Sequence, residues 1–197
     1  MKIEMPRNVE TAINLLIENG YKAYAVGGCI RDSLLGFAPD DWDITTSATP
    51  EETEKVFSDY KVIETGVKHG TVTVIIDKTP LEITTFRIDG QYKDFRHPES
   101  VSFTSEISED LSRRDFTVNA MCYNHKEGII DCFGGKQDLE NRIIRCVRKP
   151  DERFNEDALR ILRALRFASV LGFEIEKDTS ESIFRNRHLL GSIAAER

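Results

Sequence analysis

The stretch VGGCIRDSLLGFAPDDWDITT, residues 26–46, decides the fold of this chain. A glycine pair opens a short predicted helix, and an Asp-Trp-Asp run then enters a predicted strand. Because strand side chains alternate between two faces, we expect Asp41 and Asp43 to share one face while Trp42 and Ile44 turn into the core. Two neighbouring carboxylates repel each other unless a cation lies between them, and oxygen ligands of this kind suit Mg²⁺. The pair therefore predicts a magnesium site and a phosphate-bearing partner.

The glycine pair lies just before these carboxylates in the chain. Gly27 and Gly28 let the backbone approach a ligand closely. The helix that begins near Cys29 directs unpaired amide groups toward an anion, and Arg31 lies one turn into it. We therefore expect phosphates and metal to meet on one surface, with Gly28 and Arg31 on the phosphate side.

Length and composition describe a globular chain of one domain or one and a half. It has 197 residues, of which 40% are hydrophobic, and a formal net charge of -7, so no basic face dominates. No apolar run approaches the roughly 20 residues that cross a bilayer, and the N-terminus lacks the pattern of a signal peptide. These features predict a cytoplasmic protein without a membrane partner. The scattered cysteines favour reduced, mostly buried thiols over a zinc site.

Hydrophobic periodicity predicts an α+β fold with a mixed sheet of about five strands flanked by helices. A helix begins near Asn8 and ends at Gly20, and a capping box of Thr49 and Glu52 begins another at Pro50. The predicted strands cover residues 22–28, 41–46, 61–65, 70–77 and 81–87. Residues 105–124 have helical apolar spacing, and residues 129–147 predict two short strands around a glycine turn and a helical turn.

The ordered set of GGxxRD, a short loop and DxD resembles the active-site core of nucleotidyltransferases of the DNA polymerase beta superfamily. It is most similar to class II CCA-adding enzymes and their relatives, the bacterial poly(A) polymerases, and the similarity covers most of residues 20–172. The resemblance implies addition of C and A to the 3′ end of tRNA from CTP and ATP, with release of pyrophosphate. Members of that family are longer than this chain, so it also implies that body and tail regions are missing.

Three further segments gain a role from this resemblance. Glu82 shares a strand face with Thr84 and is implied as a third catalytic carboxylate that ligates metal or accepts the proton of the attacking hydroxyl; the alternative is a solvated glutamate. Residues 88–105 correspond to a flexible loop that helps the switch from CTP to ATP; the alternative is a surface loop without a role. The segment with Arg114 and Asp115 resembles RRDFTxNAM, which implies that Asp115 binds the ribose hydroxyls; the alternative is a salt bridge at a helix start.

The segment PDERFNEDALRILRALRFASVLG, residues 150–172, predicts one long helix with an apolar face of Ala158, Leu159, Leu162 and Leu165. Asp157 and Arg160 are three residues apart, so an acceptor and a donor can lie side by side. Cytosine and adenine both present an amino donor beside a ring-nitrogen acceptor, and guanine and uracil present the opposite pattern. The pair therefore predicts selection of C and A, unless it only forms salt bridges on a solvated helix.

The same segment resembles the EDxxRxxR motif of the family. This implies that Glu156 positions Arg160, and that Arg163 and Arg166 lie toward triphosphate or primer. We expect a nucleotidyltransferase head over residues 1–141 and the start of an all-α neck over residues 142–197. A poly(A) polymerase, an enzyme that adds only part of CCA, a small-molecule nucleotidyltransferase and a catalytically incomplete nucleotide- or RNA-binding fragment are the alternatives, and the sequence leaves the oligomeric state open.

Overall fold

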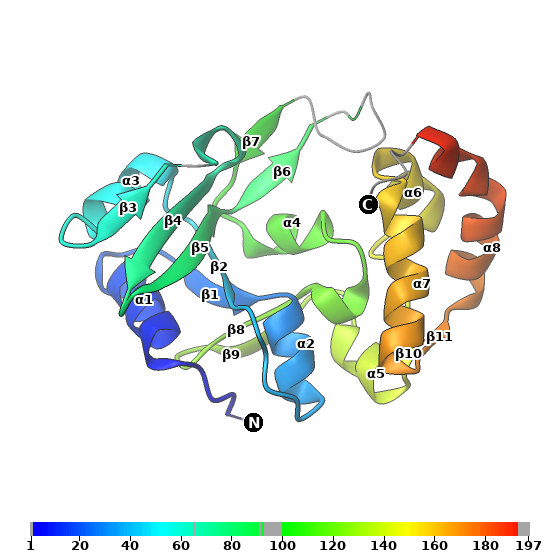
Figure 1. Ribbon diagram of the computed structural model, residues 1–197, viewed down its shortest axis with the longest axis horizontal. Helices are drawn as coiled ribbons and strands as arrows, with labels where there is room; N and C mark the ends of the chain where they lie inside the picture. Colours follow the sequence, from blue (N-terminus) through cyan, green and yellow to red (C-terminus); the bar gives the residue numbers. More distant parts are fainter. Residues whose placement is uncertain (1, 65, 91, 93–99, 193–197) are drawn as a thin grey trace.

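A computed structural model describes residues 2–64, 66–90, 92 and 100–192. Within them, seven strands form a mixed sheet in the order β3-β4-β5-β2-β1-β8-β9 (Figure 1). The strands are β1 (Ala23–Val26), β2 (Asp43–Thr46), β3 (Lys61–Ile63), β4 (Thr71–Ile76), β5 (Thr79–Thr85), β8 (Met121–Asn124) and β9 (Gly128–Asp131). The α+β prediction is confirmed, and the sheet is wider than the predicted five strands because β8 and β9 extend it beyond β1.

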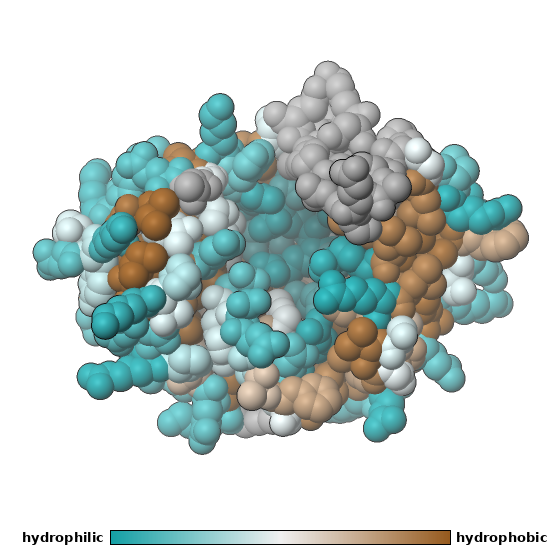
Figure 2. Space-filling view, in the orientation of Figure 1, coloured by the Kyte–Doolittle hydropathy of each residue, from teal (hydrophilic) through white to brown (hydrophobic). Residues whose placement is uncertain are grey.

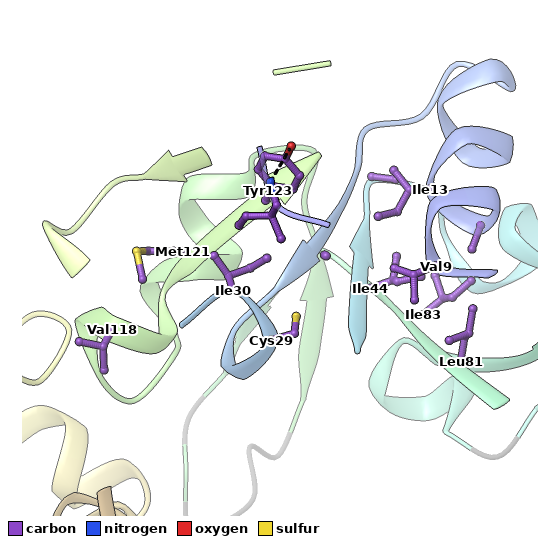
Figure 3. Close-up of a cluster of buried hydrophobic side chains, with 14 of the residues drawn as sticks. Val9, Ile13, Cys29, Ile30, Ile44, Leu81, Ile83, Val118, Met121 and Tyr123 are labelled. Atoms are coloured by element: carbon purple, nitrogen blue, oxygen red, sulfur yellow. Dashed lines mark hydrogen bonds between the residues drawn. The ribbon is translucent and has the colours of Figure 1, made fainter. Parts of the chain in front are cut away.

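Helices α1 (Arg7–Glu18) and α3 (Pro50–Val56) cover one face of the sheet (Figure 1). Figure 3 shows Val9 and Ile13 of α1 facing Ile44, Leu81 and Ile83 of the central strands, and all five side chains are buried. The predicted capping box of α3 is present, with Thr49 and Glu52 each bonded to the other's backbone amide. The predicted beginning of this helix at Pro50 is therefore confirmed.

The other face of the sheet carries α4 (Ile107–Ser112), whose Leu111 packs on Tyr24, Val26 and Cys122. The predicted helix over residues 105–124 is wrong beyond Ser112. The chain passes through a 3-10 turn, η2 (Thr117–Asn119), and then forms the fully buried strand β8 between β1 and β9. Short apolar runs of this kind suit a buried strand as well as a helix, so spacing alone misassigns them.

The region after residue 128 contains α5 (Gly135–Glu140), α6 (Pro150–Glu156), α7 (Leu159–Leu171), α8 (Lys177–Asn186) and the 3-10 turn η3 (Arg187–Ser192). It also contains β10 (Ile143–Ile144) and β11 (Glu174–Ile175), which pair in parallel. The prediction of an all-α region from residue 142 is therefore wrong at this strand pair. The two short strands, glycine turn and helical turn predicted over residues 129–147 are confirmed.

The predicted single helix over residues 150–172 is also wrong, because it breaks into α6 and α7 at Asp157 and Ala158. Asp157 has extended backbone angles, with φ -140° and ψ 102°, and its Oδ1 atom accepts a hydrogen bond from the Leu159 amide at 3.0 Å. Because of the break, α7 buries a different face from the one predicted for a single long helix. Its buried residues are Arg160, Ile161 and Ala164, while Leu162 and Leu165 are exposed.

The predicted loop over residues 88–105 begins and ends in strands. β6 (Arg87–Asp89) and β7 (Val101–Phe103) pair antiparallel above α4 (Figure 1), and residues 91 and 93–99 lie outside the described residues. Cys29, Cys122 and Cys146 are buried, as predicted, and Cys132 is exposed. Among the described residues, no helix combines the length and the apolar character that a membrane span requires.

Candidate active site

Asp43 and Glu82 lie side by side at the centre of the sheet. β2 pairs in parallel with β5 so that Ile44 is opposite Ile83, and Asp43 and Glu82 immediately precede these two residues. Since Ile44 and Ile83 point into the core, both carboxylates face the other way. Both line a cavity of about 660 Å³ together with Asp41. Asp41 itself precedes β2, so the predicted strand is wrong for residues 41 and 42.

The charge balance around Asp43 suits a bound cation. Desolvation by the surrounding protein raises the pKa of the Asp43 carboxyl; Arg114 opposes this shift, and Asp41 adds to it. Within the described residues, no group of three or more Asp, Glu, His or Cys side chains encloses a metal position. Mg²⁺ is commonly held by one or two carboxylates plus substrate phosphates and water. The carboxylates therefore fit a cation that takes some of its ligands from the protein and the others from a substrate.

The glycine turn begins α2 (Gly28–Leu34) beside these carboxylates. Gly27 has φ +85° and ψ -127°, a conformation that favours glycine, and a Cβ atom there would lie 2.9 Å from Arg114 Nη1. Arg31 of α2 donates from Nη1 to Asn119 Oδ1 at 2.7 Å and from Nε to Asp32 at 2.8 Å. The turn thus lies against Arg114, whose charge also acts on Asp43.

A closed network joins α2 to α7 through the segment after α4. Asp115 is buried, and its carboxylate accepts from Asn119 Nδ2 at 3.1 Å and from Arg163 Nε at 2.7 Å. The guanidinium groups of Arg31 and Arg163 lie 5.0 and 5.1 Å from the centre of the Phe167 ring. Phe167 was not predicted from the sequence, because an aromatic residue on an amphipathic helix carries no signal beyond core packing.

Arg160 has a structural environment that the sequence did not indicate. It is buried, and its Nη1 atom donates to Glu156 Oε2 at 2.8 Å, while its Nη2 atom donates to the Arg113 carbonyl at 3.2 Å. The predicted contact between Glu156 and Arg160 is therefore present. Asp157 lies at the helix break, half-buried, and Arg166 is exposed. The bases that these residues contact stay a prediction.

Figure 2 shows hydrophilic side chains gathered in a hollow between the sheet and α7, and a hydrophobic band along α7. Asp43 and Arg114 share a second, smaller cavity on this side of the sheet. Asp43 thus lines both cavities, while Arg31, Asp115 and Arg163 belong to the network described above.

Comparison with known proteins places these features in a family. A family model described as "Poly A polymerase head domain" matches residues 23–145. The CCA-adding enzyme of Ligilactobacillus salivarius is 52% identical over 180 residues, which cover 91% of this chain and 44% of the relative. The CCA-adding enzyme of Geobacillus kaustophilus is 51% identical over 185 residues, which cover 94% of this chain and 45% of the relative. The chain therefore spans less than half the length of these curated relatives.

Solved structures agree with the sequence matches. The Bacillus stearothermophilus CCA-adding enzyme in complex with CTP superposes with a TM-score of 0.86 at 44% identity, covering 96% of this chain and 46% of the other. The Thermotoga maritima CCA-adding enzyme complexed with tRNA superposes with a TM-score of 0.79 at 28% identity, covering 98% and 45%. Since the family model matches more than half of the sequence, this chain belongs to the poly A polymerase head domain family.

Proposed function

We propose that this chain is the catalytic part of a template-independent tRNA nucleotidyltransferase that adds C and A to the tRNA 3′ end from CTP and ATP and releases pyrophosphate. The observation that carries the proposal is the adjacency of Asp43 and Glu82 beside the glycine turn of α2. Its similarity to CCA-adding enzymes, including one solved with CTP and one with tRNA, supports the choice of substrates.

The carboxylates supply the chemistry of this proposal. The family suggests a divalent metal, and we propose Mg²⁺ held by Asp41 and Asp43. When bound, the metal lowers the pKa of the attacking 3′-hydroxyl and neutralises charge on the transferred phosphate. Glu82 accepts the hydroxyl proton or completes the ligand set. Gly28 leaves room for a triphosphate, and Arg31 neutralises part of its charge.

The remaining predicted residues select the nucleotide. Asp115 binds the ribose hydroxyls, and Arg163 holds its carboxylate in place. Asp157 accepts from the amino group of C or A while Arg160 donates to the neighbouring ring nitrogen, and Arg166 contributes charge toward triphosphate or primer. Guanine or uracil presents the opposite pattern and would lose these two hydrogen bonds, at roughly 1–3 kcal/mol each.

We divide the chain into a nucleotidyltransferase head over residues 1–141 and the beginning of a neck over residues 142–197. The end of the family match at residue 145 supports this boundary. We place the reaction in the cytoplasm on the sequence features described above.

The test is incorporation of nucleotides into a tRNA that lacks its 3′-terminal CCA, with Mg²⁺ and the four nucleoside triphosphates, followed by sequencing of the products. CCA addition supports the proposal. A tail of A alone would identify a poly(A) polymerase, and C alone an enzyme of partial CCA addition. Binding of CTP and ATP without turnover would identify a nucleotide-binding fragment. The observation that favours this alternative is that the chain spans less than half the length of its relatives.

A matched pair of variants tests the site itself. Asp43→Asn removes a charge from the catalytic region and is expected to reduce incorporation about a thousandfold, since a metal supplies several kcal/mol of transition-state stabilisation. Asp59→Asn makes the same change at an exposed position after α3 and should leave incorporation unchanged. Wild-type activity in Asp43→Asn would refute the metal assignment.

A further inference from the structure

A cavity of about 230 Å³ lies against Asp43, on the face of the sheet that also carries α4. Its lining mixes guanidinium groups and hydroxyls around a single carboxylate. The lining residues are Val26, Asp43, Ile44, Thr71, Thr84, Arg87, Arg113 and Arg114. Neither the sequence motifs nor the proposed mechanism gives a role to Thr71, Thr84 or Arg87.

Arg87 lines the cavity as a largely desolvated guanidinium with both cationic and anionic neighbours. Its Nη1 atom donates to the His69 carbonyl at 2.5 Å, and its Nε atom lies 3.1 Å from Asp89 Oδ1. That Nε and that Oδ1 are nevertheless both buried without a well-directed hydrogen bond. Burial is the largest cause that lowers the pKa of the Arg87 guanidinium, and the neighbouring Arg113 lowers it further; the charges of Asp89 and Asp110 oppose these two effects only in part. An anion in the cavity would offset both effects.

Thr71 and Thr84 add hydroxyl groups to the same wall. They are directly opposite each other in the antiparallel pair of β4 and β5, and their Oγ1 atoms are 3.0 Å apart. A hydrogen bond between two hydroxyls uses one proton, so the pair keeps a second proton and several lone pairs for a ligand. Phosphate and ribose oxygens are ligands of matching chemistry.

The order of strands indicates which ligand reaches this cavity. β1, which leads into the glycine turn, lies on one side of β2, while β5 and β4 lie on the other. In phosphoryl transfer the attacking and leaving oxygens lie in line on opposite sides of the phosphorus. If the leaving pyrophosphate lies at the glycine turn, the 3′ end of the RNA primer approaches from the opposite side of β2. Glu82 and Thr84 of β5 and Thr71 of β4 lie on that side.

We infer that Thr71, Thr84 and Arg87 bind the last sugar-phosphate unit of the RNA primer and position its 3′-hydroxyl near Asp43. Arg87 neutralises the phosphate, and the threonine hydroxyls bond to phosphate or ribose oxygens. This inference rests on the proposed nucleotidyl transfer and names positioning residues for its second substrate.

The test compares variants of the full chain by the KM for a tRNA lacking CCA, the KM for CTP and the calorimetric affinity for CTP. Arg87→Gln is expected to raise the KM for tRNA about tenfold or more, with CTP affinity unchanged. The logarithm of the tRNA binding constant falls linearly with the logarithm of the salt concentration. The magnitude of that slope should decrease by about 0.7–1, the contribution of one phosphate contact. Arg87→Lys keeps the charge and should restore most of that slope.

The double variant Thr71→Val with Thr84→Val tests the same site independently, in case Arg87→Gln does not fold. Valine has nearly the same shape as threonine, and replacing both partners of a hydrogen bond is close to neutral for stability. This variant should raise the KM for tRNA severalfold at unchanged salt dependence. Lys126→Gln, an exposed charge change in the turn between β8 and β9, is the control and should alter neither KM.

The outcomes separate this inference from the proposed function. A wild-type chain that incorporates no nucleotide refutes both. A wild-type chain that is active, with unchanged KM for tRNA in Arg87→Gln and in the double threonine variant, refutes the primer subsite alone. A rise in the KM for CTP with an unchanged KM for tRNA would assign the cavity to the triphosphate and likewise overturn the inference.

Discussion

Arg163 of α7 holds Asp115 through two nitrogen atoms, since both Nε and Nη2 lie 2.7 Å from Asp115 Oδ2. The other carboxylate oxygen accepts from the Phe116 amide and from Asn119. Asp115 is thus fixed from both sides, by its own segment and by a helix that begins 44 residues later. The residue proposed to bind the ribose is therefore held at an orientation that depends on α7.

The first prediction concerns this ion pair. Arg163→Gln should destabilise the chain, because Asp115 keeps a buried negative charge with fewer partners. In a double-mutant cycle with Asp115→Asn, we expect a coupling free energy of about 1 kcal/mol, measured by urea unfolding. Additive effects of the two substitutions would show that the pair is not coupled. In CTP incorporation, Arg163→Gln should also reduce the discrimination against dCTP.

The second prediction separates base selection from helix capping at Asp157. Asp157→Asn keeps an Oδ1 atom that can accept from the Leu159 amide, so unfolding should change little. The substitution replaces one acceptor oxygen with an amino donor, so the pattern presented to a base changes. The ratio of the CTP and UTP affinities measured by calorimetry should therefore fall about tenfold. Asp178→Asn, an exposed change in the first turn of α8, is the control. An unaltered CTP-to-UTP ratio in Asp157→Asn would remove Asp157 from the base-reading pair.

The third prediction concerns the glycine turn. Gly27→Ala places a Cβ atom 2.9 Å from Arg114 Nη1 at a backbone conformation that costs non-glycine residues about 1–3 kcal/mol. Both thermal stability and CTP affinity should fall. Gly20→Ala shares the positive φ, +89°, but has open space around its Cβ position, so it should lower stability alone. Equal CTP affinities in the two variants would contradict a role for the turn in binding.

The fourth prediction is a pH dependence at the beginning of α8. Desolvation raises the pKa of the Glu176 carboxyl, but hydrogen bonds from Thr179 and Asp178 and the charge of Arg145 outweigh this effect, so the net pKa is lowered. A carboxyl with a depressed pKa stabilises the fold above its unfolded-state pKa, and this contribution is lost as the pH falls through the folded-state value.

Glu176→Gln should therefore lower the free energy of unfolding at about pH 7 by up to about 1 kcal/mol, and by less as the pH approaches 3. Urea unfolding at both pH values measures the difference. Glu181→Gln, whose ion pairs with Lys177 and Arg185 are exposed, should have little effect at either pH. A difference between wild type and Glu176→Gln that grows toward low pH would contradict the assigned direction.

Features that depend on neighbours in the sequence could be predicted well. The capping box at Thr49, the glycine turn and the strand alternation around Ile44 all follow from interactions within a few residues. The face on which Asp43 lies was predicted for the same reason. Its place beside Glu82 was implied only by the family resemblance, because strand order in a mixed sheet is set by the packing of the whole domain.

The errors occur where distant contacts override local pattern. The break at Asp157 turns α7 so that Arg160 reaches the Arg113 carbonyl, a bond to a residue 47 positions away. A pattern of arginines every three residues gave no sign that one of them would be buried. Likewise, residues 121–124 form a strand because β1 and β9 flank them, although their apolar spacing also suits a helix.

The parallel pairing of β2 with β5 also has a consequence for how the molecule acquires its proposed activity during folding. Thr45 and Thr84 are 39 residues apart, so the two strands cannot meet until a long loop has closed. Such non-local contacts form slowly compared with helices and hairpins. In refolding experiments, recovery of catalysis should therefore follow the slowest structural phase rather than the first appearance of secondary structure, and a nascent chain ending before β5 contains Asp41 and Asp43 without the strand that completes their site.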